Sequence, residues 1–270
     1  MSGLFVCCSL FASLLTFNPS DGLLKNSLAA PAYFLQSIFS SNSLPAQTKN
    51  AKSYTIALVG DSMTHTLSTA DPLRDALKSY YPEKEFGILN FGIGATSILT
   101  VPERLLTQTQ REDEGLPAIL DTKPDIILLE SMGNNPLSEL PLSEGLKKQN
   151  ETLDRIVKII EEERPKTVLI FVGTIAPLKE KYALGIVDLT AEQRISWANE
   201  RIAYIKNHIK YAQTHNISLI NLFDISQTES GEGRAEFISQ KDFIHPSQEG
   251  IEFIQKQIAD FIFNQKIIPR

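Results

Sequence analysis

The chain is poor in cysteine, and this shortage narrows what it can be. Of its 270 residues only Cys7 and Cys8 are cysteines, and they are adjacent. Neighbouring cysteines rarely suit disulfide geometry. The sequence therefore predicts no disulfide framework, no cysteine zinc site and no cysteine nucleophile. There are only four histidines and they form no HExxH pattern, so we expect no metal site either.

Positive charge is scarce and scattered. The chain has 26 Lys and Arg against 32 Asp and Glu, a formal net charge of -6, and no basic block of five or more residues. Nucleic acid or an anionic membrane surface is therefore not expected as the main partner. Hydrophobic residues make up 42% and charged residues 21%, which is enough apolar surface for a sizeable buried core.

The N-terminal segment has an apolar run that is too short to cross a bilayer. Ser2 to Phe17 carries no charge, but a spanning helix needs about 20 residues. Its length suits a signal peptide, although no Lys or Arg precedes it. We favour an export signal or a membrane anchor, and hence an exported or membrane-anchored protein over a cytoplasmic one. The alternatives are a flexible or core-packing extension and a misassigned start codon. We expect residues 1–50 to be this segment with its linker, and residues 51–270 to be one domain.

The remaining chain alternates between strand-like and helix-like patterns. The strand-like segments are short apolar runs rich in β-branched residues, and they cover residues 54–60, 86–92, 125–131, 167–173 and 217–223. Because parallel strands need crossover connections, five such runs separated by helices predict an α/β fold. We expect a parallel sheet of about five strands with helices on both faces.

Three helices have recognisable signals. Thr190 and Gln193 form a capping-box pattern before an apolar stripe over residues 195–209. A second stripe over residues 146–160 follows Ser143, which we expect to be its cap. The last helix, with its stripe over residues 251–262, should begin at Pro246 and Ser247. We interpret these stripes as core-facing surfaces.

The motif G-D-S-M follows the first predicted strand. In open parallel sheets, ligands bind beyond the carboxyl ends of the strands, so Ser62 lies where a site should form. Gly60 permits a tight turn that exposes the serine, whose own N–H can help to stabilise an oxyanion. The alternative is that Asp61 and Ser62 only cap a helix.

Two further clusters can supply oxyanion donors. The glycines of "NFGIGATS", residues 90–97, can expose backbone N–H groups, although a strand-to-helix turn is the alternative. A dinucleotide-binding loop is excluded because Ser97 replaces the third glycine. In "SMGNNPL" the short amides Asn134 and Asn135 can donate to a developing negative charge. Asparagine before proline is also common in simple turns.

The fourth cluster, "DFIHPSQEG", can supply a base. Asp242 lies three residues before His245, close enough to hold the imidazole in one tautomer. A structural histidine near a helix start is the alternative. Together the four clusters provide a nucleophile, oxyanion donors and an oriented base. Their order Ser…Asp…His also occurs in α/β-hydrolases, but the G-x-S-x-G motif of that fold is absent.

These blocks resemble the SGNH (GDSL-type) hydrolases over roughly Tyr54 to Phe263. G-D-S-M resembles the first block of the family and implies that Ser62 is the nucleophile. G-N-N-P resembles its G-x-N-D block and implies that Asn135 is an oxyanion-hole residue. D-F-I-H-P is similar to its D-x-x-H-P block and implies that His245 is the catalytic base and that Asp242 is the carboxylate that orients it.

The sequence departs from the family pattern at two points. Pro136 stands where aspartate is usual, so the turn after Asn135 can differ. The glycine block is one residue shorter than usual. We assign the oxyanion glycine to Gly94, because Ala95 and Thr96 follow it, and keep Gly92 as the alternative.

The resemblance implies a flavodoxin-like three-layer fold that needs no metal or organic cofactor. It also implies hydrolysis of ester or thioester bonds through an acyl-enzyme on Ser62, with a small-molecule, lipid or carbohydrate ester as substrate. Two other functions stay open: an O-acyltransferase that acts on cell-envelope carbohydrate, and a non-catalytic binding module. Apolar side chains in two loops are interpreted either as an acyl pocket or as a packed lid. They are Leu137, Leu140, Leu142, Leu178, Tyr182 and Leu184.

Overall fold

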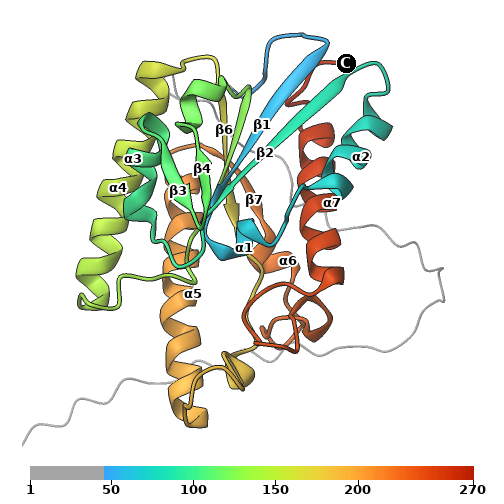
Figure 1. Ribbon diagram of the computed structural model, residues 1–270. Helices are drawn as coiled ribbons and strands as arrows, with labels where there is room; N and C mark the ends of the chain where they lie inside the picture. The colour runs from blue at the N-terminus through green and yellow to red at the C-terminus, as the bar shows by residue number, and fades with distance from the viewer. Residues whose placement is uncertain (1–45) are drawn as a thin grey trace, which may run out of the picture. The chain divides into compact units, whose positions relative to one another are not determined.

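The computed structural model describes residues 46–270, and a five-stranded parallel sheet is its central layer (Figure 1). Its strands are β1 (Ser53–Gly60), β2 (Glu85–Gly92), β5 (Ile126–Glu130), β6 (Val168–Gly173) and β7 (Ser218–Asn221). Every neighbouring pair is parallel. The predicted α/β class and all five predicted strands are therefore confirmed.

The strands follow the order β2-β1-β5-β6-β7, which is the flavodoxin-like order. The chain leaves β1 toward β2 on one side and later returns to place β5 on the other side. The connections that leave the carboxyl ends of β1 and β5 therefore run in opposite directions. In this type of sheet, ligands bind at that point, beyond the carboxyl ends of the strands.

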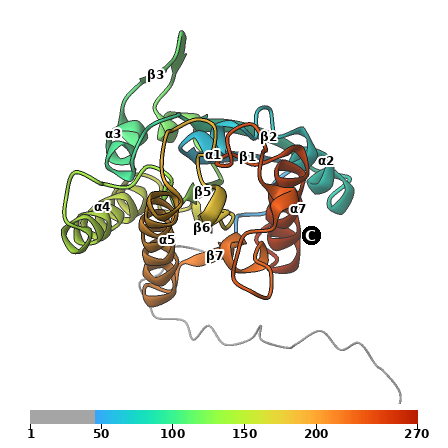
Figure 2. The ribbon, with the colours of Figure 1, turned by 90° about the horizontal axis from the view of Figure 1, so that it is seen from below.

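Helices cover both faces of the sheet, as expected. Figure 2 shows α2 (Asp71–Tyr80) and α7 (Gln248–Asn264) on one face of the sheet and α3 (Val101–Leu106), α4 (Leu142–Glu163) and α5 (Ala191–Thr214) on the other. Alternate residues of β1 serve the two cores: Ile56 and Leu58 pack with α2 and α7, whereas Ala57 and Val59 pack on the opposite face. This two-sided burial explains why the strands read as continuous apolar runs.

Shorter elements connect these layers. They are α1 (Ser62–His65), α6 (Leu222–Ile225), the antiparallel pair β3 (Thr109–Arg111) and β4 (Glu114–Leu116), and 3-10 turns at Ile98–Thr100, Ile119–Thr122, Lys179–Lys181 and Ala235–Phe237. The sequence did not predict the hairpin of β3 and β4. Its strands have three residues each and are mostly polar, so no alternating pattern marks them.

The first residues of α4, α5 and α7 can be compared with the helix caps that the sequence predicted. The box at Thr190 is confirmed, with Gln193 N–H donating to the threonine side chain and Thr190 N–H to the glutamine side chain. Ser247 caps α7 by accepting from Gly250 N–H. The Ser143 prediction is wrong. The carbonyl of Pro141 accepts the first helical hydrogen bonds, so α4 begins at Leu142 and Ser143 lies inside its first turn.

The predicted signal or anchor over residues 2–17 lies outside the described residues. Between residues 46 and 270 no helix is both long and apolar enough to cross a membrane. The predicted boundary after residue 50 stays a prediction. Thr48 already packs against the body of the fold, because its N–H donates to the carbonyl oxygen of Ile267 at 2.8 Å.

Candidate active site

Ser62, His245 and Asp242 form a continuous hydrogen-bonded chain. Ser62 is the first residue of α1, directly beyond the carboxyl end of β1. Its Oγ lies 2.9 Å from Nε2 of His245, and Nδ1 of the same ring lies 2.9 Å from Oδ2 of Asp242. The structure thus brings together three residues that are up to 183 positions apart in the chain.

The contact with the Asp242 carboxylate determines which ring nitrogen of a neutral His245 carries the proton. Because a carboxylate only accepts, Nδ1 carries the ring proton, and Nε2 is left to accept from the Ser62 hydroxyl. The other carboxylate oxygen accepts from the backbone N–H groups of Ile244 and His245, both at 2.9 Å. Burial alone would raise the pKa of Asp242. The hydrogen bonds from Ile244 and His245 outweigh it and hold the pKa below the usual 3.8.

The loop that carries Asp242 and His245 is fixed by the segment before it. Ser239 N–H donates to the His245 carbonyl, and Ile238 and Pro246 form an antiparallel bridge. Phe243, between the two site residues, has a φ of 54°, an unusual conformation for a bulky side chain. Strain of this kind persists only where the surrounding contacts enforce it, and it concentrates at functional sites.

The two asparagines of the predicted oxyanion block have different partners. Asn135 donates from Nδ2 to Oδ2 of Asp61 at 2.7 Å, which holds its amide beside the start of α1. The side-chain oxygen of Asn134 instead accepts from the Tyr182 hydroxyl at 2.9 Å. Asn135 is therefore the one that lies next to the nucleophile segment, in the register that the sequence block suggested.

The glycines after β2 also have different surroundings. A Cβ placed on Gly94 would lie 3.9 Å from the Cβ of Ser62, so this backbone is adjacent to the serine. Gly92 packs against the backbone of His65, and its N–H donates to the Asn90 side chain at 2.8 Å. Within residues 46–270, no acceptor occupies the N–H of Ser62 or of Gly94. Gly94 thus has the free donor near Ser62, and Gly92 does not.

Three buried charged residues lie beneath the site, and the sequence analysis considered only Asp61 among them, as a helix cap. Asp61 caps α1 by accepting from Met63 N–H at 2.8 Å, and Glu130 ends β5. Arg104 donates to the carbonyls of Gly60 and Phe91, which joins the ends of β1 and β2. Burial lowers the pKa of Arg104 to about 10, against the opposing effect of the Asp61 charge. The available signals were the aspartate within G-D-S-M and a glutamate that closes an otherwise apolar strand.

The side chains proposed for an acyl pocket or a lid differ in burial. Leu137 and Tyr182 are buried, and Tyr182 packs with Ala198 of α5. Leu178 packs against the core on the α7 face, Leu140 is half-buried, and Leu142 and Leu184 are exposed. Whether they line a pocket or form a lid stays a prediction.

No group of His, Cys, Asp and Glu side chains in the described part of the chain has the arrangement of a metal site.

Comparison with known proteins identifies the fold. No protein-family model and no curated protein matches the chain. Among solved structures, the lipase/acylhydrolase from Enterococcus faecalis is 16% identical with a TM-score of 0.56, covering 78% of this chain and 96% of its own. A protein assigned to the G-D-S-L lipolytic family from Desulfitobacterium hafniense DCB-2 is 15% identical with a TM-score of 0.54, covering 77% and 99%. The acetyl xylan esterase AlAXEase is 15% identical with a TM-score of 0.52, covering 76% and 97%. The chain therefore has the SGNH hydrolase fold.

Proposed function

We propose that this protein is a serine esterase that cleaves carboxylic esters through an acyl-enzyme on Ser62. The observation that carries the proposal is the hydrogen-bonded chain from Ser62 Oγ through His245 to Asp242. It lies at the carboxyl edge of the sheet, where this fold binds ligands. The similarity to lipases, acylhydrolases and esterases supports the same reaction class.

In the proposed reaction, Nε2 of His245 takes the hydroxyl proton as Ser62 Oγ attacks the ester carbonyl. The Asp242 carboxylate stabilises the imidazolium that forms. The imidazolium then gives its proton to the alcohol as the bond from the carbonyl carbon to the alkoxy oxygen breaks. Water attacks the acyl-enzyme in the second half, with His245 again as base, and releases the acid and free Ser62.

Three groups are proposed to stabilise the tetrahedral oxyanion. They are the backbone N–H groups of Ser62 and Gly94 and the side-chain amide of Asn135. Asn135 has two N–H bonds, and one of them is directed to Asp61. The other stays available for the oxyanion, and the bond to Asp61 limits rotation of the amide. Such preorganised donors contribute most because they need no rearrangement during the reaction.

The decisive test combines active-site labelling with a substrate series. We expect a fluorophosphonate probe to label the native protein at Ser62 and to leave Ser62→Ala unlabelled. Ser68→Ala, which changes an exposed serine one turn beyond α1, is the matched control and should label normally. p-Nitrophenyl esters from acetyl to long acyl should then reveal the acyl length. Labelling at another residue, or none in the native protein, would refute the proposal.

The same acyl-enzyme could pass its acyl group to a sugar hydroxyl, which would make the protein an O-acyltransferase. A product assay with and without a carbohydrate acceptor separates the two reactions. Hydrolysis that is unaffected by the acceptor supports the esterase, and acylated carbohydrate supports the transferase. A binding module without catalysis would show neither product and no labelling.

We also propose that residues 1–50 direct export or anchor the protein to a membrane. The support is the uncharged apolar run over residues 2–17. Fractionation of cells that express the full chain tests this directly. Recovery in the cytoplasm with an intact N-terminus would contradict it.

A further inference from the structure

Two buried carboxyl groups lie side by side below the nucleophile. Asp61 follows β1 and Glu130 ends the neighbouring β5, and a Cβ placed on Gly60, the residue before Asp61, would lie only 3.0 Å from the Cβ of Glu130. The two carboxyl groups are within hydrogen-bonding reach of each other. Asp61 is 0% exposed and Glu130 is 7% exposed. Carboxyl groups are rarely buried to this extent without a compensating partner.

Asp61 has an extensive set of donors. Oδ1 accepts from Met63 N–H at 2.8 Å, which caps the helix that begins with Ser62. Oδ2 accepts from the Asn135 amide at 2.7 Å. One carboxylate therefore links the element that carries the nucleophile to the proposed oxyanion side chain.

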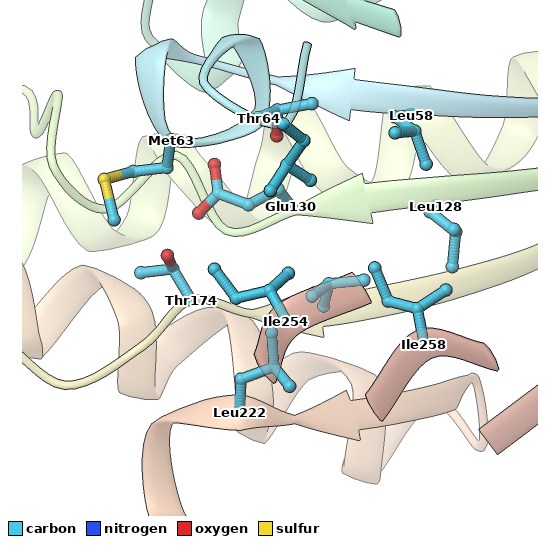
Figure 3. Close-up of a pocket in the computed structure, with 11 residues that line it drawn as sticks. Leu58, Met63, Thr64, Leu128, Glu130, Thr174, Leu222, Ile254 and Ile258 are labelled. Carbon is cyan, nitrogen blue, oxygen red and sulfur yellow. The ribbon is translucent and has the colours of Figure 1, made fainter. Parts of the chain in front are cut away.

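The carboxyl group of Glu130 is less completely satisfied by hydrogen-bond donors than that of Asp61. Oε1 accepts from the Ser131 hydroxyl at 2.7 Å, and within residues 46–270 the buried Oε2 has no hydrogen-bond partner. Figure 3 shows this carboxyl pointing from the end of β5 into a small cavity, between Thr64 of α1 and Thr174. The cavity has a volume of about 30 Å³, and most of its lining is aliphatic.

The positive charge near Asp61 and Glu130 is too small to stabilise both carboxyl groups in their ionised form. Arg104 is the cation beneath the site whose charge acts on Asp61, and it is already committed to two backbone carbonyls. His245 acts on Asp61 from the loop before α7, and the Tyr182 hydroxyl lies within electrostatic reach of Asp61. The cavity residues from β1, β6, α6 and α7 are all uncharged. Two adjacent carboxylates in such surroundings cannot both ionise at neutral pH.

The two members of the pair are distinguishable. Burial raises the pKa of Glu130 well above its ordinary 4.5, and the charge of Asp61 raises it further, although hydrogen bonds from the Ser131 hydroxyl and from the backbone N–H groups of Met132 and Asp61 act in the opposite direction. Burial also raises the pKa of Asp61, but hydrogen bonds from Met63 N–H, Asn135 and Glu130 oppose this effect. Asp61 is thus the better-stabilised anion.

We propose that Glu130 is a positioning residue: it stays protonated, donates a hydrogen bond to Asp61, and so keeps Asp61 anionic and fixed between α1 and Asn135. The protonation state is a property of the fold, whereas the effect on turnover rests on the proposed esterase function. When Glu130 loses its proton, two facing carboxylates repel each other. The contacts of Asp61 with Met63 N–H and Asn135 then loosen.

The protonation state can be tested without an activity assay. A folded-state pKa above the unfolded value means that the folded protein binds this proton more tightly, so its contribution to stability falls as pH rises between the two values. Glu130→Gln keeps the shape and a donor but cannot ionise. We expect its Tm to exceed that of the native protein by a margin that widens from pH 5 to pH 9. Glu83→Gln, an exposed site, should show no such trend.

Infrared difference spectra and kinetics complete the test. At pH 7 the native protein and Glu83→Gln should show the carbonyl band of a protonated carboxylic acid that Glu130→Gln lacks. Glu130→Ala should lower kcat by about 10- to 100-fold with little change in KM, less than the loss of a whole oxyanion donor. Glu130→Gln should recover most of that loss and remove the alkaline decline in kcat.

Each outcome decides the proposal. An absent carboxylic-acid band with a Tm difference that does not vary with pH would show that Glu130 is ionised, and would overturn it. A Glu130→Gln variant as slow as Glu130→Ala would also overturn it. If Glu130→Ala does not fold, the band and the Tm trend of Glu130→Gln still give the answer. A native protein that hydrolyses no ester would refute the esterase function and leave these two measurements valid.

Discussion

Ser62 occupies a position that satisfies both interpretations of its motif. Asp61 does cap a helix, and Ser62, as the first residue of that helix, still directs its hydroxyl to His245. The first turn of a helix has backbone N–H groups without intrahelical partners, so this location places a free donor beside the hydroxyl. A cap and a nucleophile are therefore compatible here.

Replacing the serine tests that role. Ser62→Ala should abolish ester hydrolysis, because the loss of a nucleophile typically costs on the order of a millionfold in kcat. The fold should persist, since the helix cap is Asp61 and not Ser62. Turnover measured beside circular dichroism checks both expectations. Near-native activity in a preparation free of contaminating esterase would exclude Ser62 from the mechanism.

The residues of the proposed base should differ in their effect. His245→Ala should be nearly as damaging as Ser62→Ala, because no other group between residues 46 and 270 is hydrogen-bonded to the serine hydroxyl. Asp242→Asn should be milder, since the backbone N–H groups of Ile244 and His245 can still hold the loop. Because the pKa of Asp242 lies below its usual 3.8, Asp242 should keep its charge down to about pH 4, so a loss of turnover above that pH should not arise from protonation of Asp242. A greater loss in His65→Ala than in His245→Ala would mean that the base is misassigned.

The two asparagines offer a matched pair. Asn135→Ala should lower kcat by about 10²–10³, the usual effect of losing one oxyanion donor. Asn134→Ala should do less, because the side chain of Asn134 bonds to Tyr182 and not to the nucleophile segment. Saturation kinetics on both variants decides between them. The opposite ranking would shift the oxyanion assignment by one residue.

At the scale of elements, the confirmed helix cap at Thr190 can be compared with the incorrectly predicted cap at Ser143. Thr190→Ala should destabilise the protein by about 1 kcal/mol, because it removes one half of a complete capping box. Ser143→Ala should be nearly neutral, since the serine lies inside the first turn of α4 and alanine favours helix. Urea unfolding of both variants measures the difference. Equal losses would show that the Thr190 box contributes nothing beyond a generic serine or threonine site.

The long buried elements could be predicted from the sequence because they depend on local patterns. The central strands β1, β5 and β6 are buried on both faces and therefore appear as continuous apolar runs. The apolar stripe over residues 195–209 marks the buried side of α5. Their order in the sheet came only with the family resemblance, since periodicity does not say which strands are neighbours. The hairpin of β3 and β4 could not be predicted, because short polar strands lack a burial pattern.

Within the site, the residues that sequence blocks mark were found, and those that support them were not. Ser62, Asn135, Asp242 and His245 lie in compact motifs near strand ends. Glu130 looks like the last residue of an apolar run, and only the parallel pairing of β1 with β5 places it beside Gly60, the residue before Asp61. Pairing across strands is a long-range property that no local pattern contains.

For the whole molecule, the packed region should function without the N-terminal segment. Deleting residues 1–45 should leave a folded domain with the labelling and turnover of the full chain, because the described contacts begin at Thr48. Deleting residues 1–50 also removes the Thr48 contact with Ile267 and should lower Tm relative to the shorter deletion. Loss of folding in the shorter deletion would show that the first 45 residues belong to the core.

The hydrogen bond from Thr48 N–H to the Ile267 carbonyl has one more consequence. It brings the beginning of the packed region against its end, at the opposite end of the strands from α1, the helix that begins with Ser62 (Figure 1). A short peptide joining residue 270 to residue 46 should therefore close the chain into a ring without disturbing the site. Reopening that ring between Glu112 and Asp113, at the exposed tip of the hairpin, gives a circular permutant with new ends. We expect this permutant to fold and to keep the labelling and turnover of the full chain, since none of the residues that contact Ser62 lies in this hairpin.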